Sequence, residues 1–301
     1  MKTNRMNRIL LLTALMGGMI AGCQPLEEID SREIVDENAG KDGYTLTVEA
    51  VKKVDTKMLK LTDNGNKLDA LWKNGEKVGV YVNGTYAGQL TTKTPTGNSD
   101  EHATLSGILT NAAGIAPGAS IFLLYPDRDD IQEGTRWDYT GQTGYIQDAS
   151  AAYDYATATL TVSGIQGNEV STTGVATFQN EQSVYCFHFS QYITEFTIIS
   201  NQNKLVTSRS HAGKWTSTFG PLTVCLPGAE GNTFFVSIRN ENTTVTDTYF
   251  FLAMTHKGIL YFGTKEIETQ NLGNGKYLKP NVSLSQPDFT SIEGTYTGNI
   301  L

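Results

Sequence analysis

The side chains most often used in catalysis are scattered through this sequence of 301 residues. No serine lies in a GxSxG sequence, and neither a GxxxxGK[ST] loop nor an HExxH pair occurs. The histidines are His102, His188, His211 and His256. His188 lies between two phenylalanines of a strand-like run, which indicates a hydrogen-bonded or solvent-facing strand residue rather than a catalytic base. We therefore expect a protein without enzymatic activity and without a cofactor.

Two further groups of side chains invite a chemical interpretation. Asp127, Asp129 and Asp130 could offer oxygen ligands to Ca²⁺, but the glycine and the final glutamate of an EF-hand are missing, which favours a solvated loop and no metal site. Trp137 and Tyr139 flank an aspartate. Planar rings beside a carboxylate would suit stacking on a sugar, and the alternative is that these rings close one end of a core.

Cys23 has the most specific chemistry of any residue in the chain. Residues 1–22 combine three basic side chains with an apolar stretch too short to span a membrane, and they end in Ile20-Ala21-Gly22. This arrangement resembles a bacterial lipobox, in which the cysteine thiol receives a diacylglycerol and the freed amine a further acyl chain. Several acyl chains anchor a protein firmly. We therefore predict a lipoprotein signal peptide over residues 1–22 and a palmitate-type anchor on Cys23.

The segment after the lipid site carries little structural pattern. Residues 23–43 show no periodicity and predict a flexible tether. Acidic residues follow Cys23 closely, which resembles the surface-export signal of Bacteroides-type lipoproteins, although a solvated spacer would have the same composition. The expected location is the outer membrane, with the protein held by its lipid and facing the cell surface.

The other two cysteines are Cys186 and Cys225, each inside a strand-like run. An oxidising compartment would permit a disulfide between them. The chain has no CxxC pair, so a zinc site is not expected. Two buried free thiols are the alternative to the disulfide.

The body of the chain is patterned for strands. Leu46, Val48 and Ala50 alternate with polar residues, and Val78, Val80 and Val82 do likewise. Asn83-Gly84 then follows, which favours a type I′ hairpin turn. Similar short runs recur between turn signals up to about residue 284, and only Asp148–Ala158 has a composition that fits a turn of helix or a structured loop. We therefore predict an all-β fold.

Loop-like residues near 163–175 indicate a division of the body into two halves. We predict an amino-terminal β-sandwich over residues 44–168 and a carboxyl-terminal β-sandwich with a tail over residues 169–301, each of ordinary domain size. The formal net charge of −8 disfavours nucleic acid as a partner.

Five segments, in order along the body, resemble motifs of one family, with Leu105, Phe122 and Ala156 standing where the motifs have Phe, Tyr and Met. They are Leu71–Tyr81 (compare W-x-x-G-(D/E)-x-(I/V)-x-(V/F)), Ala103–Gly107 with Ile121–Pro126 after it (A-x-F-x-G, then Y-x-x-Y-P), Ala152–Ala158 (YDYM-x-A), Phe187–Ser190, and Gly275–Tyr277 (GK-x-Y). With the lipobox before them, they resemble the fimbrillin family, the type V pilus subunits and related lipoproteins of Bacteroides-type bacteria.

The resemblance implies two tandem transthyretin-like antiparallel β-sandwich domains and assembly into a fimbria by strand exchange. An outer-membrane protease would trim the amino-terminal segment, and Arg32 or Lys41 is the candidate position. The candidate exchanged strand contains Tyr44, Leu46, Val48 and Ala50. An open sheet edge with pockets for alternate side chains can accept a segment of another chain, which is β-augmentation.

The expected function is therefore that of a cell-surface structural or adhesive pilus subunit. Its partners would be other pilus subunits, as a homo- or heteropolymer, together with the outer membrane and a ligand on a host or bacterial surface. The alternative is a surface carbohydrate-binding lipoprotein of a glycan-uptake system, with Trp137 and Tyr139 as the sugar contacts.

Overall fold

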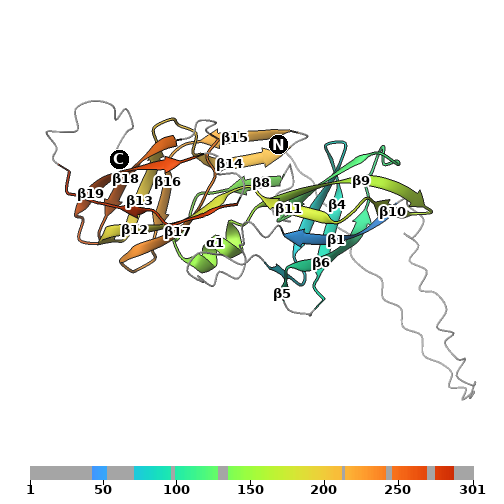
Figure 1. The fold of residues 1–301 in the computed structure, drawn as a ribbon, viewed down its shortest axis with the longest axis horizontal. Coiled ribbons are helices and arrows are strands. Elements are labelled where there is room, and N and C mark those ends of the chain that lie inside the picture. Colours follow the sequence, from blue (N-terminus) through green and yellow to red (C-terminus); the bar gives the residue numbers. More distant parts are fainter. Residues whose placement is uncertain are drawn as a thin grey trace, which may run out of the picture. The chain divides into compact units, whose positions relative to one another are not determined.

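The computed structural model describes residues 43–52, 71–95, 99–127, 135–211, 214–241, 246–269 and 275–287 (Figure 1). Within these ranges the chain is nearly all β, which confirms the predicted class. The one helix of this described part, α1 (Ile146–Ala152), overlaps the stretch for which the sequence predicts a helical turn or a loop. None of the described helical structure is long and apolar enough to cross a membrane.

Eight strands form a closed sheet around a first hydrophobic core. They are β1 (Tyr44–Lys52), β3 (Lys77–Val82), β4 (Thr85–Lys93), β6 (His102–Leu109), β7 (Ser120–Tyr125), β9 (Ala156–Gln166), β10 (Glu169–Thr172) and β11 (Ala176–Asn180). The pairing runs β1-β6-β4-β3-β7-β9, and β10 and β11 then pair with both β9 and β1. β10 and β11 lie one after the other between β1 and β9 and together take the place of one strand. The closed sheet therefore has seven strand positions.

The local sequence explains much of this sheet. The predicted turn between β3 and β4 is confirmed, with φ of 51° at Asn83 and 80° at Gly84, and Val82 pairs with Thr85 across it. The inward residues of β3 and β4 include Val78, Val80 and Leu90, all with no exposed surface. Two short strands, β2 (Trp72–Lys73) and β5 (Ser99–Asp100), pair with each other and place the Trp72 side chain in the same core.

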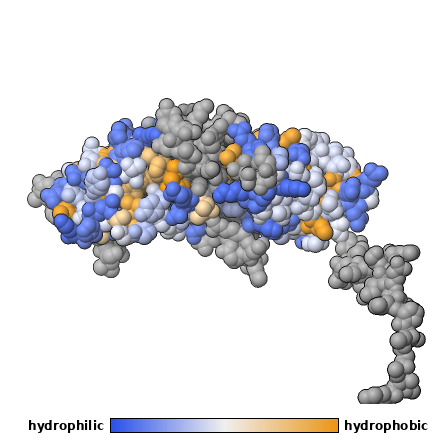
Figure 2. All heavy atoms as spheres, turned by 90° about the horizontal axis from the view of Figure 1, so that it is seen from below, coloured by the Kyte–Doolittle hydropathy of each residue, from blue (hydrophilic) through white to orange (hydrophobic). Residues whose placement is uncertain are grey.

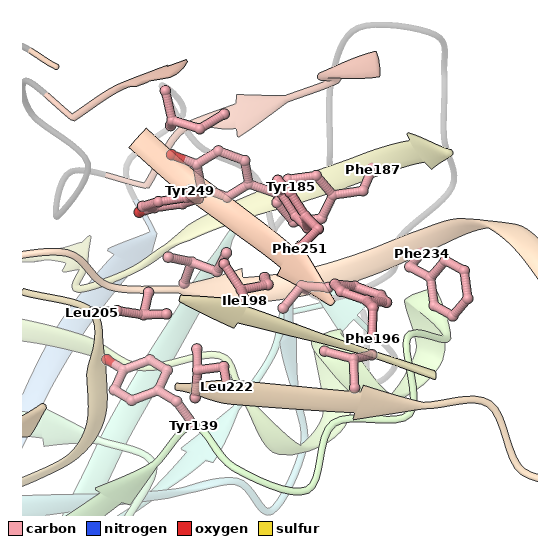
Figure 3. Packing of buried hydrophobic residues seen from close by; sticks show 14 of the residues in the cluster. Tyr139, Tyr185, Phe187, Phe196, Ile198, Leu205, Leu222, Phe234, Tyr249 and Phe251 are labelled. Carbon is pink, nitrogen blue, oxygen red and sulfur yellow. The ribbon is translucent and has the colours of Figure 1, made fainter. Parts of the chain in front are cut away.

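A second hydrophobic core lies between two further sheets. One sheet has the order β17-β12-β20, with β21 also paired to β12, and the other has the order β16-β13-β18-β19. The strands are β12 (Ser183–Ile193), β13 (Glu195–Ser200), β16 (Leu222–Cys225), β17 (Gly231–Ile238), β18 (Thr246–Met254), β19 (Leu260–Glu268), β20 (Tyr277–Leu278) and β21 (Asn281–Val282). Aromatic side chains from both sheets meet edge to face, as in Phe196 against Phe234, with ring centroids 4.9 Å apart (Figure 3).

A third sheet brings residues from both halves of the sequence together. It has the order β15-β14-β8 and is made of β8 (Thr135–Asp138), β14 (Val206–His211) and β15 (Trp215–Phe219). Trp137 of β8 stacks on Tyr155 and packs against Trp215 of β15. The second core therefore draws side chains from both sides of residue 168.

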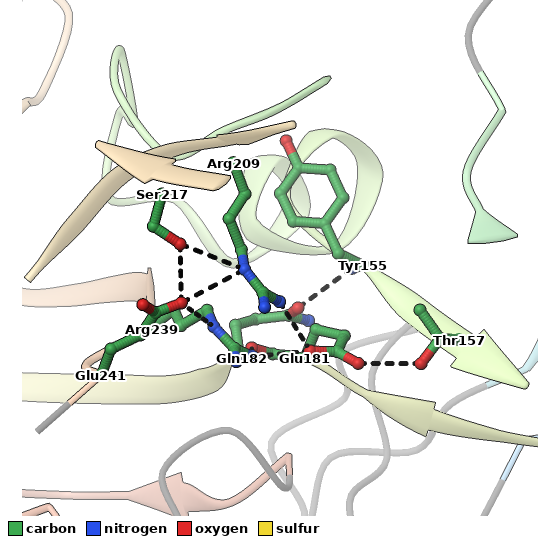
Figure 4. A network of polar contacts seen from close by, with 8 residues as sticks. All are labelled: Tyr155, Thr157, Glu181, Gln182, Arg209, Ser217, Arg239 and Glu241. Atoms are coloured by element: carbon green, nitrogen blue, oxygen red, sulfur yellow. Dashed lines mark hydrogen bonds and ion pairs between the residues drawn. The ribbon is translucent and has the colours of Figure 1, made fainter. Parts of the chain in front are cut away.

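An ionic network lies beside this third sheet (Figure 4). Glu181, in the turn between β11 and β12, accepts hydrogen bonds from the guanidinium groups of Arg209 (2.9 Å) and Arg239 (2.6 Å). Glu241 bridges the same two arginines at 3.2 and 3.3 Å. Arg209 also lies over the Trp215 ring, 4.2 Å from its centroid. The network connects the end of the closed sheet to β14 and to the residues that follow β17.

Candidate functional site

Strand β1 is the first described element of the chain, and both of its edges are paired. On one edge it runs antiparallel to β6 in continuous register from Tyr44 opposite Leu109 to Val51 opposite His102. On the other edge it runs parallel to β10, with Leu46 opposite Val170, and to β11, with Ala50 opposite Ala176. We call the surroundings of this strand the β1 seat, defined as β6, β10 and β11 together with Trp72, Tyr125 and Asp154.

The predicted exchanged strand has the two faces that its alternation predicts. Leu46, Val48 and Ala50 point into the first core, with exposed fractions of 0%, 4% and 1%. On the outer face, the Thr47 hydroxyl is 3.0 Å from the Ser106 hydroxyl of β6. Fully burying a leucine or valine side chain contributes roughly 1.5–3 kcal/mol each. The β1 seat therefore holds its strand by backbone pairing on two edges and by apolar side chains on one face.

Lys52 continues the inward alternation of β1 and is itself buried, with an exposed fraction of 2%. Its ammonium nitrogen Nζ is 3.1 Å from Oδ2 of Asp154. It also lies over two aromatic faces, 4.4 Å from the Trp72 ring centroid and 4.0 Å from that of Tyr125. A desolvated cation over an aromatic face is stabilised by about 2 kcal/mol or more. The inner end of the β1 seat is thus built around a cation.

The acidic partner of this lysine is held by a second buried residue. Asp154 comes just after Tyr153, the C-cap residue of α1, and Gln182 donates a hydrogen bond from Nε2 to its Oδ1 at 3.4 Å. Burial raises the pKa of Asp154 above its ordinary value, while the nearby Lys52 charge and the Gln182 hydrogen bond act in the opposite direction. The nearby Glu76 adds to the rise. The ionised carboxylate therefore depends on the cation that β1 supplies.

The sequence contains a signal for this ion pair. Lys52 occupies the next inward position after Leu46, Val48 and Ala50, where a charged side chain needs a buried partner. Asp154 lies inside the Ala152–Ala158 segment, between Tyr153 and Tyr155. Alternation alone could have placed the lysine in the core, but only the fold could pair it with a residue 102 positions away.

Three predicted sites lie outside the described residues. These are the lipidation site Cys23 and the two candidate processing positions, Arg32 and Lys41. Cys186 and Cys225 are described, and neither is part of a disulfide; the first is buried and the second exposed. Of the two alternatives left open by the sequence, the disulfide is therefore not formed, and the burial expected for two unbridged thiols holds for Cys186 alone. The Cys186 Sγ lies 3.6 Å from Nε2 of His188.

The aromatic residues assigned to the alternative sugar site are core residues. Trp137 and Tyr139 each have an exposed fraction of 0%. The Trp137 ring packs between Tyr155 and Trp215, with centroids 5.0 and 4.3 Å away. The structure thus contradicts the sugar-contact prediction for these residues, because protein side chains cover the ring faces that a sugar would need.

The titratable side chains of the described residues do not form a metal-ligating group of three or more. His188 is a hydrogen-bonded strand residue, as predicted, with Nδ1 3.1 Å from the Thr233 hydroxyl. His211 is enclosed by aromatic rings, stacked on Phe122 with centroids 4.9 Å apart and edge-on to Tyr81 at the same distance. Burial, with a smaller effect of the Arg209 charge, lowers the pKa of His211.

Large exposed hydrophobic side chains are dispersed over several elements. The most exposed are Tyr192 (63%), Ile108 (61%) and Val175 (49%). On the face seen in Figure 2, hydrophobic residues are scattered among hydrophilic ones. Single exposed apolar residues are normal on a protein surface and do not mark a binding site. The β1 seat is therefore the strongest candidate for a functional site.

The fold and the β1 seat together define a nearly all-β protein whose first described strand completes a closed sheet. Comparison of the sequence with protein-family models and with curated proteins gives no match. Among solved structures, a "putative cell adhesion protein" of Bacteroides uniformis is 15% identical over 79% of this chain and 96% of its own, with a TM-score of 0.39. A "putative adhesin" of Bacteroides ovatus is 11% identical over 82% of this chain and 89% of its own, with a TM-score of 0.42.

A fimbrial protein of Bacteroides ovatus is 11% identical over 81% of this chain, with a TM-score of 0.35. This chain spans 50% of that protein's length. All three TM-scores are below 0.5, so these likenesses by themselves assign neither a common fold nor a function.

Proposed function

We propose that this protein is a non-enzymatic, fimbrillin-like surface lipoprotein that joins neighbouring subunits of a pilus by exchange of strand β1. The ordered motifs behind the lipobox support the family, and the paired, inward-facing β1 supports the mode of assembly. In this proposal the two hydrophobic cores correspond to tandem transthyretin-like domains, with the division placed after β11 and not near residue 168, because β10 and β11 belong to the closed sheet and its core. The lipid on Cys23 holds the precursor in the outer membrane, facing the cell surface.

The observation that carries the proposal is the position of β1 at the start of the described chain with both edges paired. If β1 leaves, β6 loses a partner on one edge and β10 and β11 lose theirs on the other. Unpaired backbone groups beside exposed apolar side chains can accept an extended segment from another chain. Cleavage after Arg32 or Lys41 would shorten the segment that precedes β1 and so ease its withdrawal.

Cross-strand cysteines test the exchange directly. Thr47 and Ser106 are paired across β1 and β6, with hydroxyl oxygens 3.0 Å apart, which is suitable for a disulfide after replacement of both by cysteine. We expect full-length chains carrying only Thr47→Cys, mixed with chains carrying only Ser106→Cys under oxidising conditions, to form disulfide-linked dimers. The exposed Cys225 is replaced by serine throughout.

The matched control uses an equivalent pair away from the β1 seat. Thr197 of β13 and Thr223 of β16 are also paired across strands, with hydroxyl oxygens 2.9 Å apart. Chains carrying Thr197→Cys and Thr223→Cys separately should give no dimers, because neither strand is exchanged. Equal dimer yields from the two mixtures, or none from the first, contradict exchange of β1.

A further inference from the structure

The inner end of the β1 seat has properties that an apolar groove lacks. The Asp154 carboxylate is 2% exposed and the Lys52 side chain 1% exposed, so the charges meet away from water. The faces of the Trp72 and Tyr125 rings complete the enclosure of the ammonium group. A strand that lacked the cation would leave the carboxylate buried without compensation and the ring faces without their cation.

We propose that the β1 seat selects its occupant by charge: a strand from outside must present lysine or arginine at the position of Lys52, and the strand that satisfies this is β1 of a second copy. This inference rests on the proposed exchange of β1 and specifies which strand is exchanged. The residues of the β1 seat that hold the chain's own β1 then also bind β1 of a neighbouring subunit.

The carboxyl-terminal segment of a neighbour does not meet the requirement. Residues 280–301 contain neither lysine nor arginine. Lys279 is followed by Pro280, which has no backbone N–H to donate to a ladder. The described part of this segment is also already paired, since β21 runs parallel to β12 and Ser285 bridges to Phe262 of β19. Of these two segments, β1 is therefore the better fit for the seat.

The raised pKa of Asp154 is consistent with this selection. Burial favours the neutral acid, and the Lys52 charge is the largest influence in the opposite direction. Among the described residues, the charged groups that influence the carboxylate are Lys52 and Glu76, and Gln182 supplies an uncharged donor. Lys52 is the basic group of this described set, so an incoming strand has to bring its own cation.

Peptide capture by the full-length chain tests the proposal. The receptor is the chain with Lys52→Met and Ser106→Cys, whose own strand lacks the cation, with Cys225→Ser. The probes are peptides of residues 43–53 with cysteine at position 47 and lysine, arginine, methionine or glutamate at position 52. A peptide of residues 281–301 with cysteine in place of Ser283 represents the carboxyl-terminal segment. Disulfide formation with the cysteine introduced at position 106 of the receptor reports capture.

We expect the lysine and arginine peptides to be captured at least tenfold faster than the methionine, glutamate and carboxyl-terminal peptides. Asp154→Asn in the same receptor should abolish this preference, because it removes the buried charge. Equal capture of the lysine and methionine peptides, or a preference that survives Asp154→Asn, overturns the proposal. Faster capture of the carboxyl-terminal peptide than of the lysine peptide overturns it as well.

Failure of exchange and failure of charge selection give different results. If no peptide is captured by any receptor, β1 does not exchange and the proposed function fails. Charge selection is then decided on four full-length chains: the parent, Lys52→Met, Asp154→Asn and the double variant. If each substitution shifts the urea midpoint much less in the presence of the other than it does alone, the β1 seat requires the pair. If the two shifts simply add in the double variant, the proposed charge selection is overturned.

Discussion

At the scale of single residues, the Lys52–Asp154 pair should make a large contribution that depends on both partners. Removing one partner of a buried ion pair typically lowers the free energy of unfolding by about 3–5 kcal/mol, because the other charge stays buried. We expect this loss for Lys52→Met in urea unfolding at about pH 7. Lys73→Met, at an exposed position of β2, is the control and should change stability by less than about 0.5 kcal/mol.

The loss in free energy of unfolding caused by Lys52→Met should become smaller as the pH is lowered towards about 4. Without the lysine, the pKa of Asp154 in the folded chain rises further above its unfolded value. Between these two pKa values the folded chain holds a proton that the unfolded chain has released, so stability falls as pH rises through this window. The measurement is the urea midpoint of parent and variant across this range. A loss that is constant with pH would contradict the role of Asp154.

His211 should give a pH dependence of the opposite sign. Its pKa is lowered by burial, so the folded chain keeps the imidazole neutral where the unfolded chain takes up a proton. Stability should therefore fall as the pH drops below about 6.5, the ordinary histidine pKa, and level off below the folded value. His211→Phe keeps an aromatic ring against Phe122 and should flatten the profile between about pH 7 and 5. His102→Phe, at an exposed position, is the comparison and should leave the profile unchanged.

At the scale of elements, a side chain takes the place of a strand beside β17. Gln142 donates from Nε2 to the backbone oxygens of Ser237 and Tyr139, both at 2.8 Å, and its Oε1 accepts from the backbone nitrogen of Ser237 at 2.7 Å. The adjacent backbone also bridges to Val224 of β16. The segment around Gln142 thus fills the gap between the edges of β16 and β17.

Gln142→Leu should therefore destabilise the chain although it adds an apolar group to a buried position. It leaves the N–H and the C=O of Ser237 without their partners, and each buried unsatisfied group costs about 1–3 kcal/mol. Gln166→Leu, at the exposed end of β9, is the control and should have little effect. Thermal and urea unfolding measure both, and equal effects of the two substitutions would contradict this role of Gln142.

Local elements of this fold could be predicted from the sequence, but their long-range pairing could not. Alternation in residues 44–52 and the Asn83-Gly84 turn are local features, so strand β1 and the β3–β4 hairpin could be predicted. The parallel pairing of β1 with β10 and β11 could not, because it joins segments more than 120 residues apart by backbone bonds that leave no mark on side-chain pattern. The burial of Trp137 likewise depends on β14 and β15, which follow it by about 70 residues or more.

At the scale of the whole described body, two hydrophobic cores are connected by a small number of specific contacts. One is the packing of Tyr81 and Phe122, which lie on strands of the closed sheet, against His211 of β14. Glu181 is the polar connection, since it follows β11 of the closed sheet and binds two arginines of the second part. Because these contacts are continuous with both cores, we expect residues 42–301 to unfold in a single cooperative transition.

Glu181→Gln should weaken that cooperativity as well as the stability. The substitution removes the shared negative charge between Arg209 and Arg239. Among the described residues, Glu241 is then the carboxylate that remains to compensate the two guanidinium groups. Both arginines are largely buried, so the effect should exceed that of a surface ion pair and reach about 2–4 kcal/mol. Calorimetry should show a broader transition or two transitions in the variant, with a calorimetric enthalpy larger than the van't Hoff enthalpy.

Glu169→Gln, at an exposed position of β10, is the control and should keep the single transition. Two transitions already present in the parent chain would mean that the cores fold independently and that Glu181 does not couple them.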